Sequence, residues 1–188
     1  MTRKFLDDVN TEIDTLFLNN AAGEISPADL RLVCKDIIDS CINDEGIIST
    51  TSVQTGVATT STLTALDVFD TEIGGDNEFI KLDAATGTIT CAAIAGFSYG
   101  IRAQLELIAG NQEVFSIAIL VDGVQVGASG AMTSQGPGDP VSAFVEALVL
   151  SMGADAVVQL GIESQNAVDT FDLQTASIQV EIKPTRNP

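Results

Sequence analysis

The sequence lacks the residues that most catalytic and metal sites require. Its 188 residues include no histidine, no tryptophan, one tyrosine and three cysteines. Without histidine, neither a Ser-His-Asp nor a Cys-His arrangement can form. Cys34, Cys41 and Cys91 have no metal-ligand spacing, and their odd number implies no disulfide framework. No pair of acids is placed for glycosidic chemistry. We therefore expect no metal, no cofactor and no enzymatic activity.

Basic residues are scarce. Eight lysines and arginines stand against 26 acids, which gives a net charge of −18. Between Asp36 and Ile182 the only bases are Lys81 and Arg102. Phosphate contacts need clustered bases, so we expect no nucleic-acid partner and no binding to an anionic membrane. The acidity either serves solubility alone or suits a position on the outside of an assembly, away from polyanions.

Long apolar runs are also missing. None approaches the roughly 20 residues that span a bilayer, and the first eight residues contain no apolar signal core. We therefore expect synthesis in the cytoplasm, without a cleaved export signal. Hydrophobic residues still make up 45% of the chain, which is enough for a packed core.

The periodicity of the apolar residues changes near Asn43. Before this point they recur at helical spacing, and Ser26-Pro27 forms a helix start with an N-cap and a proline at the first helical position. The predicted module, residues 1–43, is a helical hairpin too small to bury both of its stripes, so it should pack on copies of itself or on a host surface. The two stripes consist chiefly of Phe5, Val9, Ile13, Leu16, Phe17, Leu30, Val33, Ile37 and Ile38.

The rest of the chain has strand character. Residues 44–66 are rich in serine and threonine with little apolar surface, which predicts an extended linker. From 67 to 188, apolar and polar residues alternate between frequent turns, and Asp122-Gly123 is a strong hairpin signal. The predicted fold is mainly β: an antiparallel jelly-roll sandwich (67–188), preceded by the short helical hairpin and the linker.

One predicted strand, at 141–150, is apolar on both faces. Its odd positions are apolar, and so are Phe144, Leu148 and Leu150 at even positions. Such a strand is covered on both sides. One face should pack in the core of the sandwich. The other face is covered either by another subunit or by the linker folding back.

Two stretches resemble known families. Residues 8–13, 23–31 and 36–40, above all Gly-Glu-Ile-Ser-Pro-Ala-Asp-Leu-Arg at 23–31, resemble an N-terminal module of tailed-bacteriophage virion proteins, including head fibres. The β portion at about 78–184, with its closing strands at 170–181, resembles the tumour-necrosis-factor-like and complement-globular-head jelly roll. Domains of the second family are usually tight trimers, which implies a trimer interface at Tyr99, Phe144, Leu148 and Leu150.

Together these resemblances imply a homotrimeric phage virion protein on the exterior of the particle. The N-terminal helices would dock on the major capsid protein or another virion protein, and the jelly roll would project, as in a capsid decoration, cement or head-fibre protein. The alternative is a tail-fibre or receptor-binding tip protein, in which exposed loops such as 128–140 contact a host-surface ligand.

Overall fold

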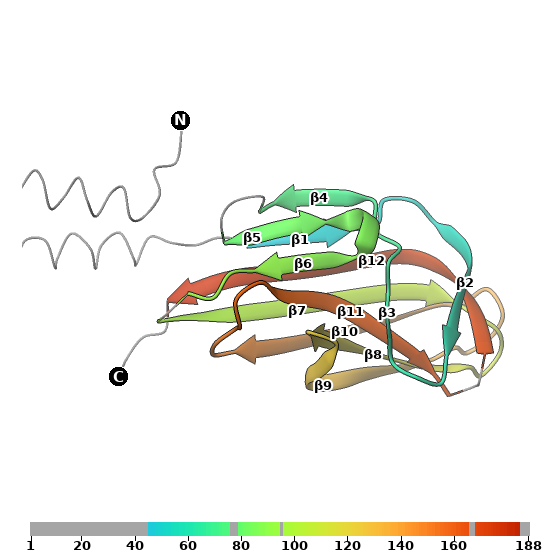
Figure 1. Cartoon of the computed structure of the whole chain (residues 1–188). Helices are drawn as coiled ribbons and strands as arrows, with labels where there is room; N and C mark the ends of the chain where they lie inside the picture. The colour runs from blue at the N-terminus through green and yellow to red at the C-terminus, as the bar shows by residue number, and fades with distance from the viewer. Residues whose placement is uncertain (1–44, 76–78, 95, 166–167, 185–188) are drawn as a thin grey trace, which may run out of the picture. The chain divides into compact units, whose positions relative to one another are not determined.

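The computed structural model describes residues 45–75, 79–94, 96–165 and 168–184, with the side chains of Val168, Asp169 and Pro184 left out. These residues form two antiparallel sheets packed face to face (Figure 1). The expected mainly β sandwich is therefore confirmed. The helical hairpin predicted for residues 1–43, with all of its proposed anchoring residues, lies outside the described residues. No helix in the described ranges is long and apolar enough to cross a membrane.

The first sheet, called sheet A, is built around the long C-terminal strand, β12, which lies between β7 and β1 (Figure 1). The strand β2 pairs with the first part of β12, ahead of the stretch that pairs with β1. In spatial order the members of sheet A are β10 (Pro140–Val149), β7 (Phe97–Ile108), β12 (Val168–Pro184), β1 (Glu45–Ser49) and β4 (Thr71–Gly74), with β2 (Gln54–Thr60) beside β12.

The second sheet, sheet B, has β11 near its centre, and the short β3 pairs with β11 off the main path. In spatial order its members are β5 (Ile80–Asp83), β6 (Thr88–Cys91), β11 (Ala156–Ser164), β8 (Val114–Val121) and β9 (Val124–Thr133), with β3 (Thr64–Ala65) beside β11. The short 3-10 helix η1 (Ala84–Thr86) connects β5 to β6.

Alternation along the strands puts the core between the sheets. In β7 the odd-numbered side chains from Phe97 to Leu107 are buried, while Arg102 and Gln104 are exposed. Phe115 of β8 and Phe171 of β12 meet edge to face across the sandwich, with ring centroids 5.6 Å apart. β7 and β12 thus bury about every second residue and turn the others to the outer face of sheet A.

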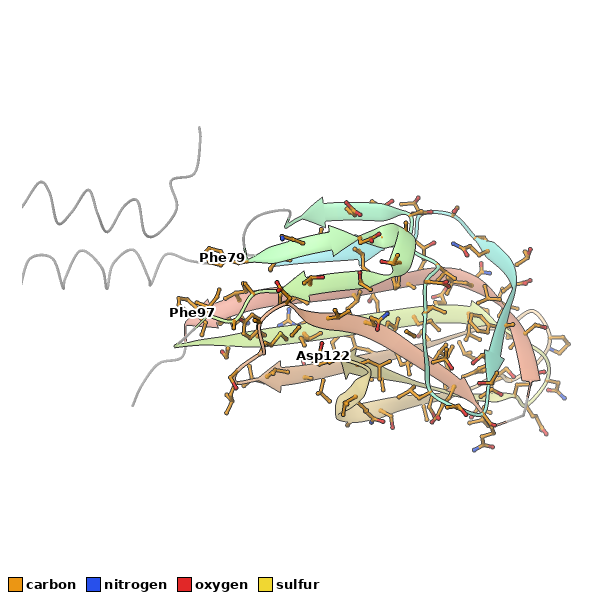
Figure 2. The ribbon with its side chains drawn as sticks, viewed as in Figure 1. Phe79, Phe97 and Asp122 are labelled. Atoms are coloured by element: carbon orange, nitrogen blue, oxygen red, sulfur yellow. The ribbon has the colours of Figure 1, made fainter. Side chains whose placement is uncertain are left out.

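The hairpin predicted at Asp122-Gly123 is confirmed. These two residues join β8 to β9 with φ values of 52° and 76°, as a two-residue turn with left-handed backbone requires (Figure 2). The Asp122 carboxylate also accepts a hydrogen bond from the Val157 N–H at 2.9 Å. The turn is therefore fixed to the neighbouring strand, β11.

The segment predicted as a linker, 44–66, differs from that expectation, since it contributes β1, β2 and β3 to the two sheets. β1 is held on both sides, by β12 and by β4. Its Ile48 is fully buried, and the Thr50 N–H beyond its end donates to the Ala176 carbonyl at 2.9 Å. One buried isoleucine and two ladders of backbone hydrogen bonds hold this strand, although its sequence offers little apolar surface.

Candidate self-association surface

The outer face of sheet A, which points away from the core, is the candidate functional surface. The strand registers place outward side chains in rows that cross the sheet. One row runs from Glu146 of β10 through Arg102 of β7, Gln179 of β12 and Ile47 of β1 to Ile73 of β4. The next row begins with Phe144 beside Gln104, and the row on the other side begins with Leu148 beside Gly100.

Apolar side chains gather at the β10 edge of this face. Phe144 and Leu148 are 56% and 65% exposed, and Leu150, just after the strand, is 65% exposed. We call these three residues the β10 patch. None of the described residues covers it, because β1 and β2 pair with β12 and β3 pairs with β11 instead of folding over β10. Within the described part of the chain, the linker alternative for covering this strand is therefore wrong.

A second apolar group lies at the opposite edge of the same face. Ile47 of β1 and Ile73 of β4 are cross-strand partners, and Ile73 is 56% exposed. We call them the β4 patch. Neither residue was predicted to belong to a surface patch: Ile47 lies in the predicted linker, 44–66, and Ile73 lies in the predicted jelly roll, where its place depends on the register between β4 and β1. The signal was the adjacent pair Ile47-Ile48, since a strand would turn one of these side chains to each face of a sheet.

Between the two patches the face is polar. Along β7 and β12 the outward positions are Ser98, Gly100, Arg102, Gln104, Glu106, Thr175, Ser177, Gln179, Glu181 and Lys183. The Lys183 ammonium lies 2.8 Å from the Glu181 carboxylate. Arg102 has no ion pair with any residue that the structure describes. The face therefore has two apolar edges and a central polar stripe that contains the Arg102 guanidinium.

Two depressions open on this face. One, of about 330 Å³, is bordered by Arg102, Glu146 and Leu148 together with Glu181 and Lys183. The other, of about 430 Å³, lies beside Phe144 and is lined by Gln104, Glu106, Ser142 and Thr175 among others. Both are open to solvent and mix polar with apolar walls. Two shallow, open depressions of this kind suit the side chains of a protein partner better than they suit a small molecule, which usually binds in an enclosed pocket.

Tyr99 does not belong to this surface, which corrects its assignment to the interface. Its side chain is fully buried in the core. The hydroxyl donates to the Ala92 carbonyl and accepts from the Ile94 N–H at 3.2 Å. Burial raises the pKa of the phenol. The odd position of Tyr99 in β7 decides its place, because the odd-numbered residues of that strand face the interior.

Groups that could carry chemistry are scattered. Among the described residues, no cluster of three or more acids, cysteines or histidines could hold a metal ion. Cys91 is buried in β6, where desolvation raises the pKa of its thiol to about 12. Such a thiol is a poor nucleophile at neutral pH.

Comparison with known proteins bears on the fold. No protein-family model and no curated protein matches the chain. Eiger TNF from S. frugiperda matches at a TM-score of 0.53 and 13% identity, over 78% of this chain and 96% of that one. Murine APRIL matches at 0.49 with 8% identity, over 74% and 98% of the two chains. The globular domain of zebrafish complement 1qA matches at 0.45 with 11% identity, over 77% and 99%. The match to Eiger shows that the sandwich is a jelly roll of the tumour-necrosis-factor type.

Proposed function

We propose that this chain is a non-enzymatic structural protein that forms a homotrimer through the outer face of sheet A. The observation that carries the proposal is the exposure of Phe144 and Leu148 in the middle of an ordered strand, with no described residue above them. Removing this apolar surface from water favours association. The resemblance to trimeric jelly rolls, together with the shared fold, supports three as the number of copies.

The two apolar patches meet a requirement of ring symmetry. In a closed ring of three, each copy contacts its neighbours through two different surfaces that must fit each other. The β10 patch and the β4 patch lie at opposite edges of one face. We propose that the β10 patch of each copy packs against the β4 patch of the next.

We further propose that the trimer decorates the outside of a phage particle, as a capsid decoration, cement or head-fibre protein, with residues 1–43 docking on the major capsid protein or another virion protein. The motif at 23–31 and the excess of acids over bases support this location. The receptor-binding alternative depends on an exposed loop at 128–140. Residues up to Thr133 of that stretch belong to β9, which leaves a shorter loop for a host ligand.

Leu148→Asp tests the trimer directly. It puts a carboxylate into the β10 patch, where association would have to bury the charge, so we expect the dissociation constant to rise by about 100-fold or more, equivalent to about 3 kcal/mol. Light scattering at several concentrations should give three times the 19.6 kDa chain mass for the unchanged protein and a lower mass for the variant.

The matched control is Thr90→Asp. Thr90 lies on β6 between Lys81 and Val157 and faces outward from sheet B, on the other side of the sandwich from both patches, so a carboxylate there should leave the mass unchanged. Circular dichroism of both variants checks that the strands still form. A monomeric unchanged protein, or a Leu148→Asp variant that associates as well as the control, would contradict the proposal.

A further inference from the structure

Arg102 is the basic residue on the outer face of sheet A that has no ion pair with any described residue. It lies at the middle of β7, exposed, with Glu146 as its cross-strand partner on β10 and Gln179 on β12. No ion pair of its guanidinium is present among the described residues, although Lys183 on the same face is paired with Glu181. The side chain therefore has its charge available for a partner.

This charge sits in an acidic domain. Among the residues that the structure describes, the bases are Lys81, Arg102 and Lys183. Lys81 is on β5 of sheet B, and Lys183 already has its carboxylate. If the outer face of sheet A is buried in a trimer, Arg102 is buried with it. A buried guanidinium without a counter-charge strongly opposes association, so in the trimer an acid must reach Arg102, either from its own chain or from the neighbouring copy.

The β10 patch carries a suitable acid. Glu146 is exposed and points outward between Phe144 and Leu148, two residues from each. When the β10 patch packs against the neighbouring copy, Glu146 therefore faces that copy as well. On that copy, Arg102 and Ile47 belong to the same row and are two strands apart, which at strand spacing is about 10 Å. An extended arginine and a glutamate together cover much of this distance.

We propose that Arg102 of each copy forms an ion pair with Glu146 of the neighbouring copy, and that this pair sets which chains can join the ring. The inference rests on the proposed homotrimer and adds the charged contact that gives it specificity. A guanidinium suits the role because it can donate two parallel hydrogen bonds to one carboxylate. Charge pairs of this kind discriminate between partners more than they add affinity.

Charge exchange in the full-length chain tests the proposal. Arg102→Glu and Glu146→Arg each place like charges in every interface, so each should raise the midpoint concentration for trimer dissociation by about tenfold or more. The double variant, Arg102→Glu with Glu146→Arg, restores an opposite pair at each interface and should form trimers again. Lys81→Glu, which makes the same change of charge on sheet B, is the control and should leave the midpoint where it is.

Mixing the unchanged chain with the double variant distinguishes an Arg102–Glu146 pair between copies from one within a single chain. A ring that contains both the unchanged chain and the double variant brings two arginines together at one interface and two glutamates at another. We therefore expect native mass spectrometry of an incubated mixture, with one chain isotopically heavy, to show only unmixed trimers. The double variant also carries the test if a single variant fails to fold.

Free mixing of the two chains, or single variants that form trimers like the unchanged protein, would overturn the ion pair and leave the homotrimer standing. An unchanged chain that is monomeric at all concentrations would overturn both.

Discussion

At the scale of single residues, Tyr99 is buried inside the core and so cannot contact another chain. Tyr99→Phe removes the hydroxyl that joins the Ala92 carbonyl and the Ile94 N–H. Because this leaves part-buried backbone groups unsatisfied, we expect the free energy of unfolding to fall by about 1–3 kcal/mol. Urea denaturation measures this loss. The trimer mass should not change, and a variant with normal stability but weakened association would return Tyr99 to the interface.

Asp70 is a second residue with a defined structural role. Its carboxylate accepts hydrogen bonds from the Ser52 hydroxyl at 2.8 Å, the Thr51 N–H at 2.8 Å and the Thr51 hydroxyl at 3.0 Å. It thus fixes the segment after β1 to the start of β4. These hydrogen bonds, led by the one from Ser52, lower the pKa of Asp70 from 3.8 to about 2.

The sign of the pH dependence follows from this shift. A carboxyl whose pKa is lower in the folded state stabilises the fold fully above the unfolded pKa of 3.8, and the contribution is lost as the pH falls through about 2. We expect Asp70→Asn to lower the thermal unfolding midpoint at pH 6, and the difference from the unchanged protein to shrink toward pH 2. Asp139→Asn, in the exposed loop before β10, is the control. A difference that is constant with pH would contradict this role.

At the scale of elements, glycines allow β9 to lie close against β10. A Cβ on Gly130 would lie 2.9 Å from the Val145 Cγ1 and 3.1 Å from the Phe144 carbonyl oxygen. Gly130→Val should therefore force the two strands apart and lower the free energy of unfolding by about 1–3 kcal/mol in chemical denaturation.

The control for Gly130→Val is Gly153→Ala, because no atom lies within 4 Å of the position of a Cβ at Gly153. We expect this change to stay within about 0.5 kcal/mol of the unchanged protein. Equal stability of the two variants would show that β9 does not need the close approach. Loss of association in Gly130→Val at normal stability would instead indicate that β9 orients the β10 patch.

The same elements show how far the sequence predicts this fold. Alternation located long strands such as β7 and β11, and Asp122-Gly123 located the hairpin, because both signals are local. β1 was missed because its partners, β12 and β4, hold it largely through backbone hydrogen bonds, and the pair Ile47-Ile48 is too short a side-chain signal to mark a strand. The outward direction of Phe144 and Leu148 followed from strand periodicity, but Ile73 required the register that brings β4 next to β1.

At the scale of the whole molecule, the proposed trimer links two charge effects of opposite sign. Each chain carries a net charge of −18, so copies repel one another, and added salt screens this repulsion. Salt also weakens an exposed Arg102–Glu146 pair, but less so when the interface buries it. A trimer that tightens with salt in the unchanged protein would show that the general repulsion outweighs the pair.

The proposed attachment to a particle can also be tested at this scale. Three copies of a weak anchor on one trimer bind together far more tightly than one anchor alone. Removing residues 1–43 should therefore abolish co-sedimentation with phage particles that bind the full chain, while the remaining jelly roll stays trimeric. Leu148→Asp should also reduce co-sedimentation, because it leaves the anchor intact but makes it monovalent. Particles that retain the truncated chain would place the docking surface on the jelly roll, and particles that bind Leu148→Asp normally would show that one anchor suffices.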